Sequence, residues 1–176
     1  MGNFRLGLFV MVLAFIMPGL ACAETPRPTP TAAEQRLDQI LAADREESGQ
    51  HASLFFFMVG RPQADPALSA YYHSFFTEAL LDAWHRAEAR SVKQQCNGRY
   101  LSGEICGLDY DPLSCSQEMP DSYVYRTQMQ TATSAMIEAG ASQAASPAAT
   151  YHLIKSGPLW KIDGVDCGDV RFHWRS

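Results

Sequence analysis

Apolar and polar positions along this chain follow two rhythms, one typical of helices and one typical of strands. From Ala32 to Ser48, apolar residues recur at three- and four-residue steps opposite a charged face, which predicts an amphipathic helix ended by Ser48-Gly49. The same steps, now with many aromatic residues, predict a long helix from about Ala67 to Lys93. Asp65-Pro66 provides a suitable start for this second helix.

The segment between these helices and the half of the chain after Cys96 have different patterns. Ser53–Val59 is apolar on every side and fits a buried strand or a buried helical turn; we favour a helix packed under a sheet. After Cys96, turn-forming residues separate short runs that fit strands, and Gly157-Pro158 predicts a hairpin turn between the last two. The predicted strands span Tyr123–Met129, Ser134–Ala139, Thr150–Lys155 and Leu159–Val165. Helices followed by antiparallel strands predict an α+β fold.

The first 23 residues predict export from the cytoplasm. Arg5 precedes an apolar run from Leu6 to Met17, and the small residues Ala21 and Ala23 flank Cys22. The run is shorter than the roughly 20 residues that a membrane-spanning helix needs, so we interpret residues 1–23 as a signal peptide cleaved after Ala23. Attachment of a lipid at Cys22 is the alternative.

The rest of the chain predicts a linker and one domain. Proline alternates with polar residues in 24–31, which is typical of an extended linker, and 32–176 then forms a single domain. The 14 Lys and Arg residues against 19 Asp and Glu give a formal net charge of −5, which argues against nucleic acid as a partner. No apolar run after the signal peptide is long enough to cross a membrane. We expect a periplasmic or secreted protein whose oligomeric state the sequence leaves open.

Four cysteines follow the signal peptide, and in an oxidising compartment an even number predicts disulfides. Three pairings are possible. We favour Cys96–Cys106, whose short loop contains turn-forming residues, together with Cys115–Cys167, which ties the middle of the chain to its last strand. The alternatives are a zinc site or a redox pair, but the spacing fits neither a structural zinc site nor a Cys-x-x-Cys motif.

One group of residues is a candidate for a binding or catalytic pocket. Asp109 and Asp111 flank a tyrosine, and two carboxylates this close can hold a cation or act as a general base, although Asp before Pro is also a common turn former. Tyr72 or His73 could face the same pocket with Glu78 nearby; the alternative is that Tyr72 belongs to the core. No metal ion or cofactor is predicted, because the five histidines lack the spacing of a metal site.

The tryptophans near the C-terminus suggest two different roles. Trp160 alternates with polar residues in a predicted strand, which indicates a core position. Phe172, Trp174 and Arg175 follow the last predicted strand, and exposed aromatic and arginine residues are enriched at protein contacts. We therefore interpret these three residues as a candidate partner surface, with simple packing at the end of the strand as the alternative.

Two motifs give a resemblance to a known family. They are CGLDYDPLSCSQEMP, which follows the long helix, and the terminal hairpin YHLIKSGPLWKIDGVDCG. With these motifs, roughly Ser69 to Gly168 resembles a bacterial envelope family, domain of unknown function 3828. The resemblance implies a cone-like fold of the nuclear-transport-factor-2 type, in which a curved antiparallel sheet wraps N-terminal helices and leaves a pocket at its wide end. Such cones serve as isomerases, ligand carriers, dimerisation modules and immunity proteins, so the fold does not select a function.

Two functional hypotheses follow. The first is an exported, non-enzymatic envelope protein that binds another protein, as an accessory subunit or an immunity-type inhibitor. The second is a small-molecule binder or isomerase-like enzyme that uses the pocket of the cone, lined by Tyr72, Asp109 or Asp111. A deep cavity in which an acid meets a hydroxyl favours the second hypothesis, whereas a filled cone favours binding through the outer surface.

Overall fold

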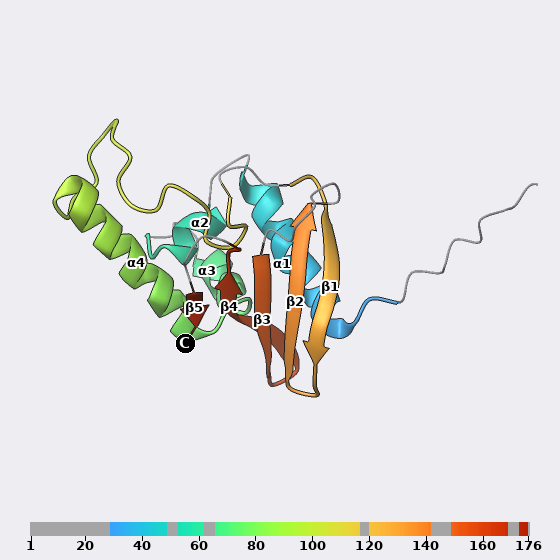
Figure 1. The fold of residues 1–176 in the computed structure, drawn as a ribbon. Helices are drawn as coiled ribbons and strands as arrows, with labels where there is room; N and C mark the ends of the chain where they lie inside the picture. The colour runs from blue at the N-terminus through green and yellow to red at the C-terminus, as the bar shows by residue number, and fades with distance from the viewer. Residues whose placement is uncertain are drawn as a thin grey trace, which may run out of the picture.

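Helices packed on an antiparallel sheet form the described part of the protein (Figure 1). The computed structural model describes residues 29–48, 53–61, 66–116, 120–141, 149–168 and 173–175. The helices are α1 (Ala32–Ser48), α2 (Ser53–Met58), α3 (Pro66–His73) and α4 (Glu78–Cys96). The strands are β1 (Tyr123–Gln130), β2 (Ser134–Ala141), β3 (Ala149–Ser156), β4 (Leu159–Asp166) and β5 (His173–Arg175). The α+β prediction is confirmed.

The strands lie in the sheet in the order in which they follow one another in the chain, β1-β2-β3-β4-β5, and all neighbours are antiparallel. Gly157, with φ +62°, makes the predicted turn between β3 and β4. Helix α1 lies against one face of the sheet and contacts β1 and β4, α2 packs on α1, α3 and α4, and α4 contacts β4 and β5 at one side (Figure 1). The four predicted strands are all present, and β5 is an additional strand that the sequence did not predict.

Aromatic side chains fill the space between the helices and the sheet. Side chains of β2 and β3 alternate between buried and more exposed positions, as expected for strands with one face on a core. Trp160 is buried, as predicted. The largest side chains with no exposed surface are Trp84, Tyr72, Tyr151, Phe75 and Phe76. The rings of Tyr72, Phe75, Phe76 and Trp84 contact one another in series, and Tyr151 belongs to the same buried cluster, which gives the described helices and strands one common core.

The prediction of one long helix from Ala67 to Lys93 is wrong. The chain leaves the helical path after His73 and pairs with Ile162 of β4. The backbone N–H of Ile162 donates to the carbonyl of Phe75 at 2.8 Å, and the backbone N–H of Thr77 donates to the carbonyl of Ile162 at 3.0 Å. Thr77 then starts α4, because its side chain accepts a hydrogen bond from the backbone of Leu80. Pairing with the sheet therefore replaces one helical turn in the middle of the predicted helix.

Two disulfides, Cys96–Cys106 and Cys115–Cys167, join the cysteines in the pairing that the sequence favoured. The first closes a loop of sequence separation 10 directly after α4, and the second spans a separation of 52. Cys167 follows β4, which is not the last strand, so the expectation about the last strand is corrected by the presence of β5. Within the ranges described above, no helix is both long and apolar enough to span a membrane.

Candidate functional site

The three residues of the predicted pocket lie in three different environments. Tyr72 has no exposed surface and packs its ring against Phe57 and Phe75. Asp109 is exposed, whereas Asp111 is half-buried in a turn. Tyr72 thus belongs to the aromatic core, and a pocket shared by Tyr72, Asp109 and Asp111 stays a prediction. Nearby, His73 Nδ1 lies 3.3 Å from Glu78 Oε1, and both of these side chains are exposed to solvent.

Asp111 organises the turn that the sequence predicted around it. Its Oδ1 accepts hydrogen bonds from the backbone N–H groups of Leu113 (2.7 Å) and Ser114 (3.0 Å). Its carboxyl group also lies beside that of Asp44 on α1, which is 3% exposed. Burial raises the pKa of Asp111, although the two backbone donors and Asp44 act in the opposite direction. The structural interpretation of Asp111 as a turn residue thus holds, and the sequence did not predict its contact with Asp44.

Two tyrosines lie close to this pair of acids. The hydroxyl of Tyr151 donates a hydrogen bond of 2.8 Å to the carbonyl of Leu113. Burial, followed by the charges of nearby groups that include Asp44 and Asp111, raises the pKa of both Tyr151 and Tyr123, so these phenols stay protonated. The Asp44 and Asp111 carboxyl groups thus lie near two protonated phenols.

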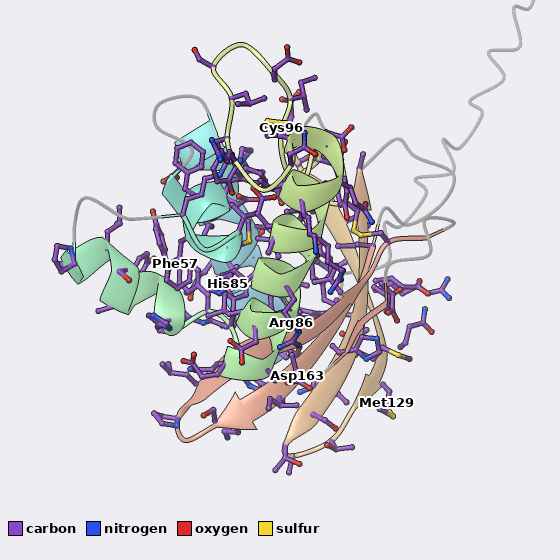
Figure 2. The ribbon with its side chains drawn as sticks, turned by 90° about the vertical axis from the view of Figure 1, so that its left-hand side faces the viewer. Phe57, His85, Arg86, Cys96, Met129 and Asp163 are labelled. Carbon is purple, nitrogen blue, oxygen red and sulfur yellow. A yellow bond between two sulfur atoms is a disulfide. The ribbon has the colours of Figure 1, made fainter. Side chains whose placement is uncertain are left out.

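Exposed apolar side chains gather on the loop closed by Cys96 and Cys106, which we call the Cys96–Cys106 loop. Tyr100, Leu101 and Ile105 are 54%, 50% and 75% exposed, and they are three of the eight large apolar residues that are exposed in the described part of the chain. Figure 2 shows Cys96 at one end of α4, with the loop projecting beyond it into solvent. Apolar residues grouped in this way are typical of interaction surfaces.

The base of this loop is fixed to α4 by Glu88, which is 2% exposed. The Glu88 carboxylate accepts hydrogen bonds from Arg61 Nη2 (2.9 Å), the Tyr100 hydroxyl (2.8 Å) and the backbone N–H of Leu108 (2.6 Å). Gly107 has φ +101°, and any Cβ at this position would overlap the Glu88 carboxylate. The loop is therefore held by a buried charge as well as by the disulfide.

Further contacts from one face of α4 and from α2 support the same base. The backbone of Gly107 donates to Gln95 Oε1 and its carbonyl accepts from Ser91 Oγ, each at 2.8 Å. The Arg61 guanidinium lies 4.5 Å from the centre of the Tyr100 ring and 5.1 Å from that of Phe56. Burial alone would lower the pKa of Arg61, but hydrogen bonds with Glu88 and Tyr100 raise it, so its charge persists. These contacts leave Leu101 and Ile105 presented on a rigid base.

The candidate partner surface at the C-terminus lies only partly within the described residues. Trp174 and Arg175 belong to β5, and their backbones pair with Val165 and Gly164 of β4. These positions therefore extend the sheet and do not follow its last strand. This corrects the predicted placement: pairing with β4 places the segment in the sheet. Phe172 and the side chains of Trp174 and Arg175 lie outside the described residues, and their role as a partner surface stays a prediction.

Comparison with known proteins yields no relative. The chain matches no family model, no curated protein and no solved structure. Among the residues that the structure describes, no three His, Cys, Asp or Glu side chains are grouped so that they could hold a metal ion. The resemblance to domain of unknown function 3828 stays a prediction.

The sequence contained a signal for the Cys96–Cys106 loop that its interpretation missed. Turn-forming residues predicted that the chain doubles back between the two cysteines, but Tyr100, Leu101 and Ile105 have no regular spacing and predict no core position. A short, turn-rich loop cannot bury large apolar side chains in a core of its own. Their exposure could have been inferred from that conflict alone.

Proposed function

We propose that this protein is exported and acts by binding another protein of the cell envelope through the Cys96–Cys106 loop, without catalysis. One observation carries the proposal: the space between helices and sheet is filled by buried aromatic rings, while apolar side chains are exposed on a covalently closed loop. The two disulfides are compatible with a protein that works outside the cytoplasm. An accessory subunit or an immunity-type inhibitor fits this arrangement.

The rigidity of the loop supports a binding role. A partner that binds a mobile loop must supply the free energy needed to order it, which is about 0.5–1.5 kcal/mol for each immobilised side chain. Here the disulfide, the Glu88 contacts and the ring of Tyr100 over Arg61 order the loop in advance. Leu101 and Ile105 are 50% and 75% exposed, so their apolar surface is available to a partner.

Crosslinking in cells tests the proposal. A photoreactive amino acid placed at Ile105 should give one discrete, stoichiometric product with an envelope protein, whereas the same amino acid at Asp82, an exposed position of α4, should give none. Leu101→Asp should remove the product without lowering the midpoint of thermal unfolding, because exposed substitutions change stability by about 0.5 kcal/mol or less. Equal labelling from both positions, or no product from Ile105, would count against the loop as a binding surface.

The alternative, a small-molecule binder or isomerase-like enzyme, is favoured by one observation. The Asp44–Asp111 carboxyl pair lies near the phenols of Tyr123 and Tyr151, and an acid beside a hydroxyl is an arrangement that proton-transfer enzymes use. Asp44 is nearly inaccessible, however, and a catalytic base must reach its substrate. Asp44→Asn separates the two functions: a binding protein keeps its crosslink from position 105, whereas an enzyme of this kind loses its activity.

A further inference from the structure

A second surface feature lies at the opposite side of the sheet, between α1 and the edge strand β1. It is a groove of about 330 Å³, and the residues that line it are Pro30, Glu34, Gln35, Asp38, Tyr123, Val124 and Tyr125. Figure 1 shows β1 as the outermost strand on this side, with α1 behind it. The groove therefore does not belong to the Cys96–Cys106 loop, which extends from α4 at the other end of the sheet.

Two carboxylates stand one helical turn apart on the α1 side of this groove. Glu34 Oε2 accepts a hydrogen bond from the backbone N–H of Thr31 (2.8 Å), and Glu34 Oε1 accepts one from Thr127 Oγ1 (2.6 Å). Asp38 Oδ1 accepts a hydrogen bond of 2.7 Å from the hydroxyl of Tyr125. Each carboxylate keeps free lone pairs, because its oxygens can accept about four hydrogen bonds. The acids are thus positioned by the fold and can still bind a cation.

The strand side of the groove consists of aromatic rings. Tyr123 and Tyr125 point to the same face of β1 because they are two residues apart, and their rings stack with centres 6.3 Å apart at 28°. Burial and then the contact with Asp38 raise the pKa of Tyr125, so its phenol remains a donor to that carboxylate. Aromatic faces attract cations, and the attraction increases where carboxylates stand opposite.

The charges and the backbone at this place are both complementary to an extended basic chain. The charged residues that line the groove, Glu34 and Asp38, are both acidic. Two cations are nearby and each has a partner: Arg45, whose charge acts on Tyr123 and Tyr125, donates to the carbonyl of Asp121 at 3.0 Å, and Arg126 of β1 lies 3.3 Å from Glu138. In the described ranges β1 pairs with β2 on one side, and no strand pairs with its outer edge. A free edge offers backbone donors and acceptors to an added strand.

We propose that the groove between α1 and β1 binds an extended basic segment of another protein, which adds along the edge of β1 and places a lysine or arginine between the α1 carboxylates and the tyrosine rings. Main-chain hydrogen bonds with β1 align the segment along the edge of the sheet, and the carboxylates of Glu34 and Asp38 favour a segment with basic side chains. This site is separate from the loop through which the proposed function acts, and it stands whether or not that loop binds a partner.

A synthetic peptide tests this site directly. The probe is a short capped peptide in which lysine alternates with threonine, titrated into the purified full chain and followed by calorimetry and by amide exchange. Binding should protect amides of β1 from exchange and should weaken as salt is added. Asp38→Asn keeps the size of the side chain and an acceptor for Tyr125, and it should weaken binding up to about fivefold, the effect of losing an exposed ion pair. Asp82→Asn, a matched change at an exposed position of α4, should leave binding unchanged.

Three results would overturn the proposal. The first is equal affinity of the wild type and Asp38→Asn for the lysine peptide. The second is equally tight binding of a peptide with glutamate at each lysine position. The third is full competition by spermidine without protection of β1, which would show a site for amines and no added strand. Position 101 lies outside the groove, so Leu101→Asp tests the loop alone. If this variant loses the crosslink from position 105 but still binds the peptide, the loop and the groove are separate sites.

Discussion

Substitution of Glu88 is expected to be among the most damaging single changes in the described structure. Glu88→Ala removes the acceptor of three hydrogen bonds and leaves the Arg61 guanidinium without its counterion. Loss of one member of a buried ion pair costs about 3–5 kcal/mol. Because the side chain of Arg61 is 27% exposed and that of Glu88 3% exposed, water can partly replace the lost partner. We therefore expect Glu88→Ala to lower the free energy of unfolding by about 3 kcal/mol, the lower end of this range.

Urea unfolding measures this loss, with two variants for comparison. Glu88→Gln keeps one acceptor oxygen but points an amide donor at another donor, so it should cost about 1–3 kcal/mol, less than alanine. Asp82→Ala, an exposed position of the same helix, should change stability by less than about 0.5 kcal/mol. The amide of Leu108 should lose its protection from exchange in Glu88→Ala, because Glu88 is its acceptor. If Glu88→Ala behaves like Asp82→Ala, the buried charge does not hold the loop.

Other predictions concern the covalent bridges, one glycine and the acid pair. Replacing Cys115 and Cys167 by alanine should cost about 4 kcal/mol in the chain-entropy relation, against about 3 kcal/mol for the shorter bridge, and urea midpoints measure the difference. Gly107→Ala should destabilise by more than about 2 kcal/mol in the same assay, since a Cβ there overlaps a carboxylate. Burial raises the pKa of Asp111 above 3.8, so the folded protein binds a proton at this carboxyl group more tightly than the unfolded chain does. The protonated carboxyl group therefore stabilises the fold at low pH, and this stabilisation is lost as the pH rises through the pKa of the folded state. Asp111→Asn should remove that part of the decline in stability toward neutral pH, and parallel pH profiles of variant and wild type would contradict the assignment.

Local patterns were sufficient to predict most elements of this fold. The spacing of apolar residues in Ala32–Ser48 and their alternation in β2 and β3 predict elements with one buried side. In the structure these sides face the common core. Ser53–Met58 was ambiguous by pattern, and its helical state agrees with the interpretation that favoured a helix under a sheet. The pairing of the cysteines followed from the shortest loop that turn-forming residues could close.

Contacts between distant parts of the chain explain what the sequence did not predict. Phe75 and Phe76 fit the helical rhythm, and only the pairing with Ile162 shows that they leave the helix, although Thr77 is a recognisable start for α4. The same holds for the acid pair: Asp44 and Asp111 are far apart in the sequence, and no pattern in either segment connects them. Chemistry that depends on such contacts becomes visible only when the chain is folded.

The two disulfides contribute differently to this protein, and the difference supports a binding role for the shorter one. In the chain-entropy relation, closure of a separation of 52 stabilises by about 4 kcal/mol and closure of a separation of 10 by about 3 kcal/mol, so the Cys115–Cys167 bridge makes the larger contribution to global stability. The Cys96–Cys106 bridge encloses residues that have little contact with the core, and Glu88 already fixes the base of the loop from inside. Besides its contribution to stability, a bridge at this place therefore fixes the shape in which Leu101 and Ile105 meet solvent, which is useful to a surface that must fit a partner.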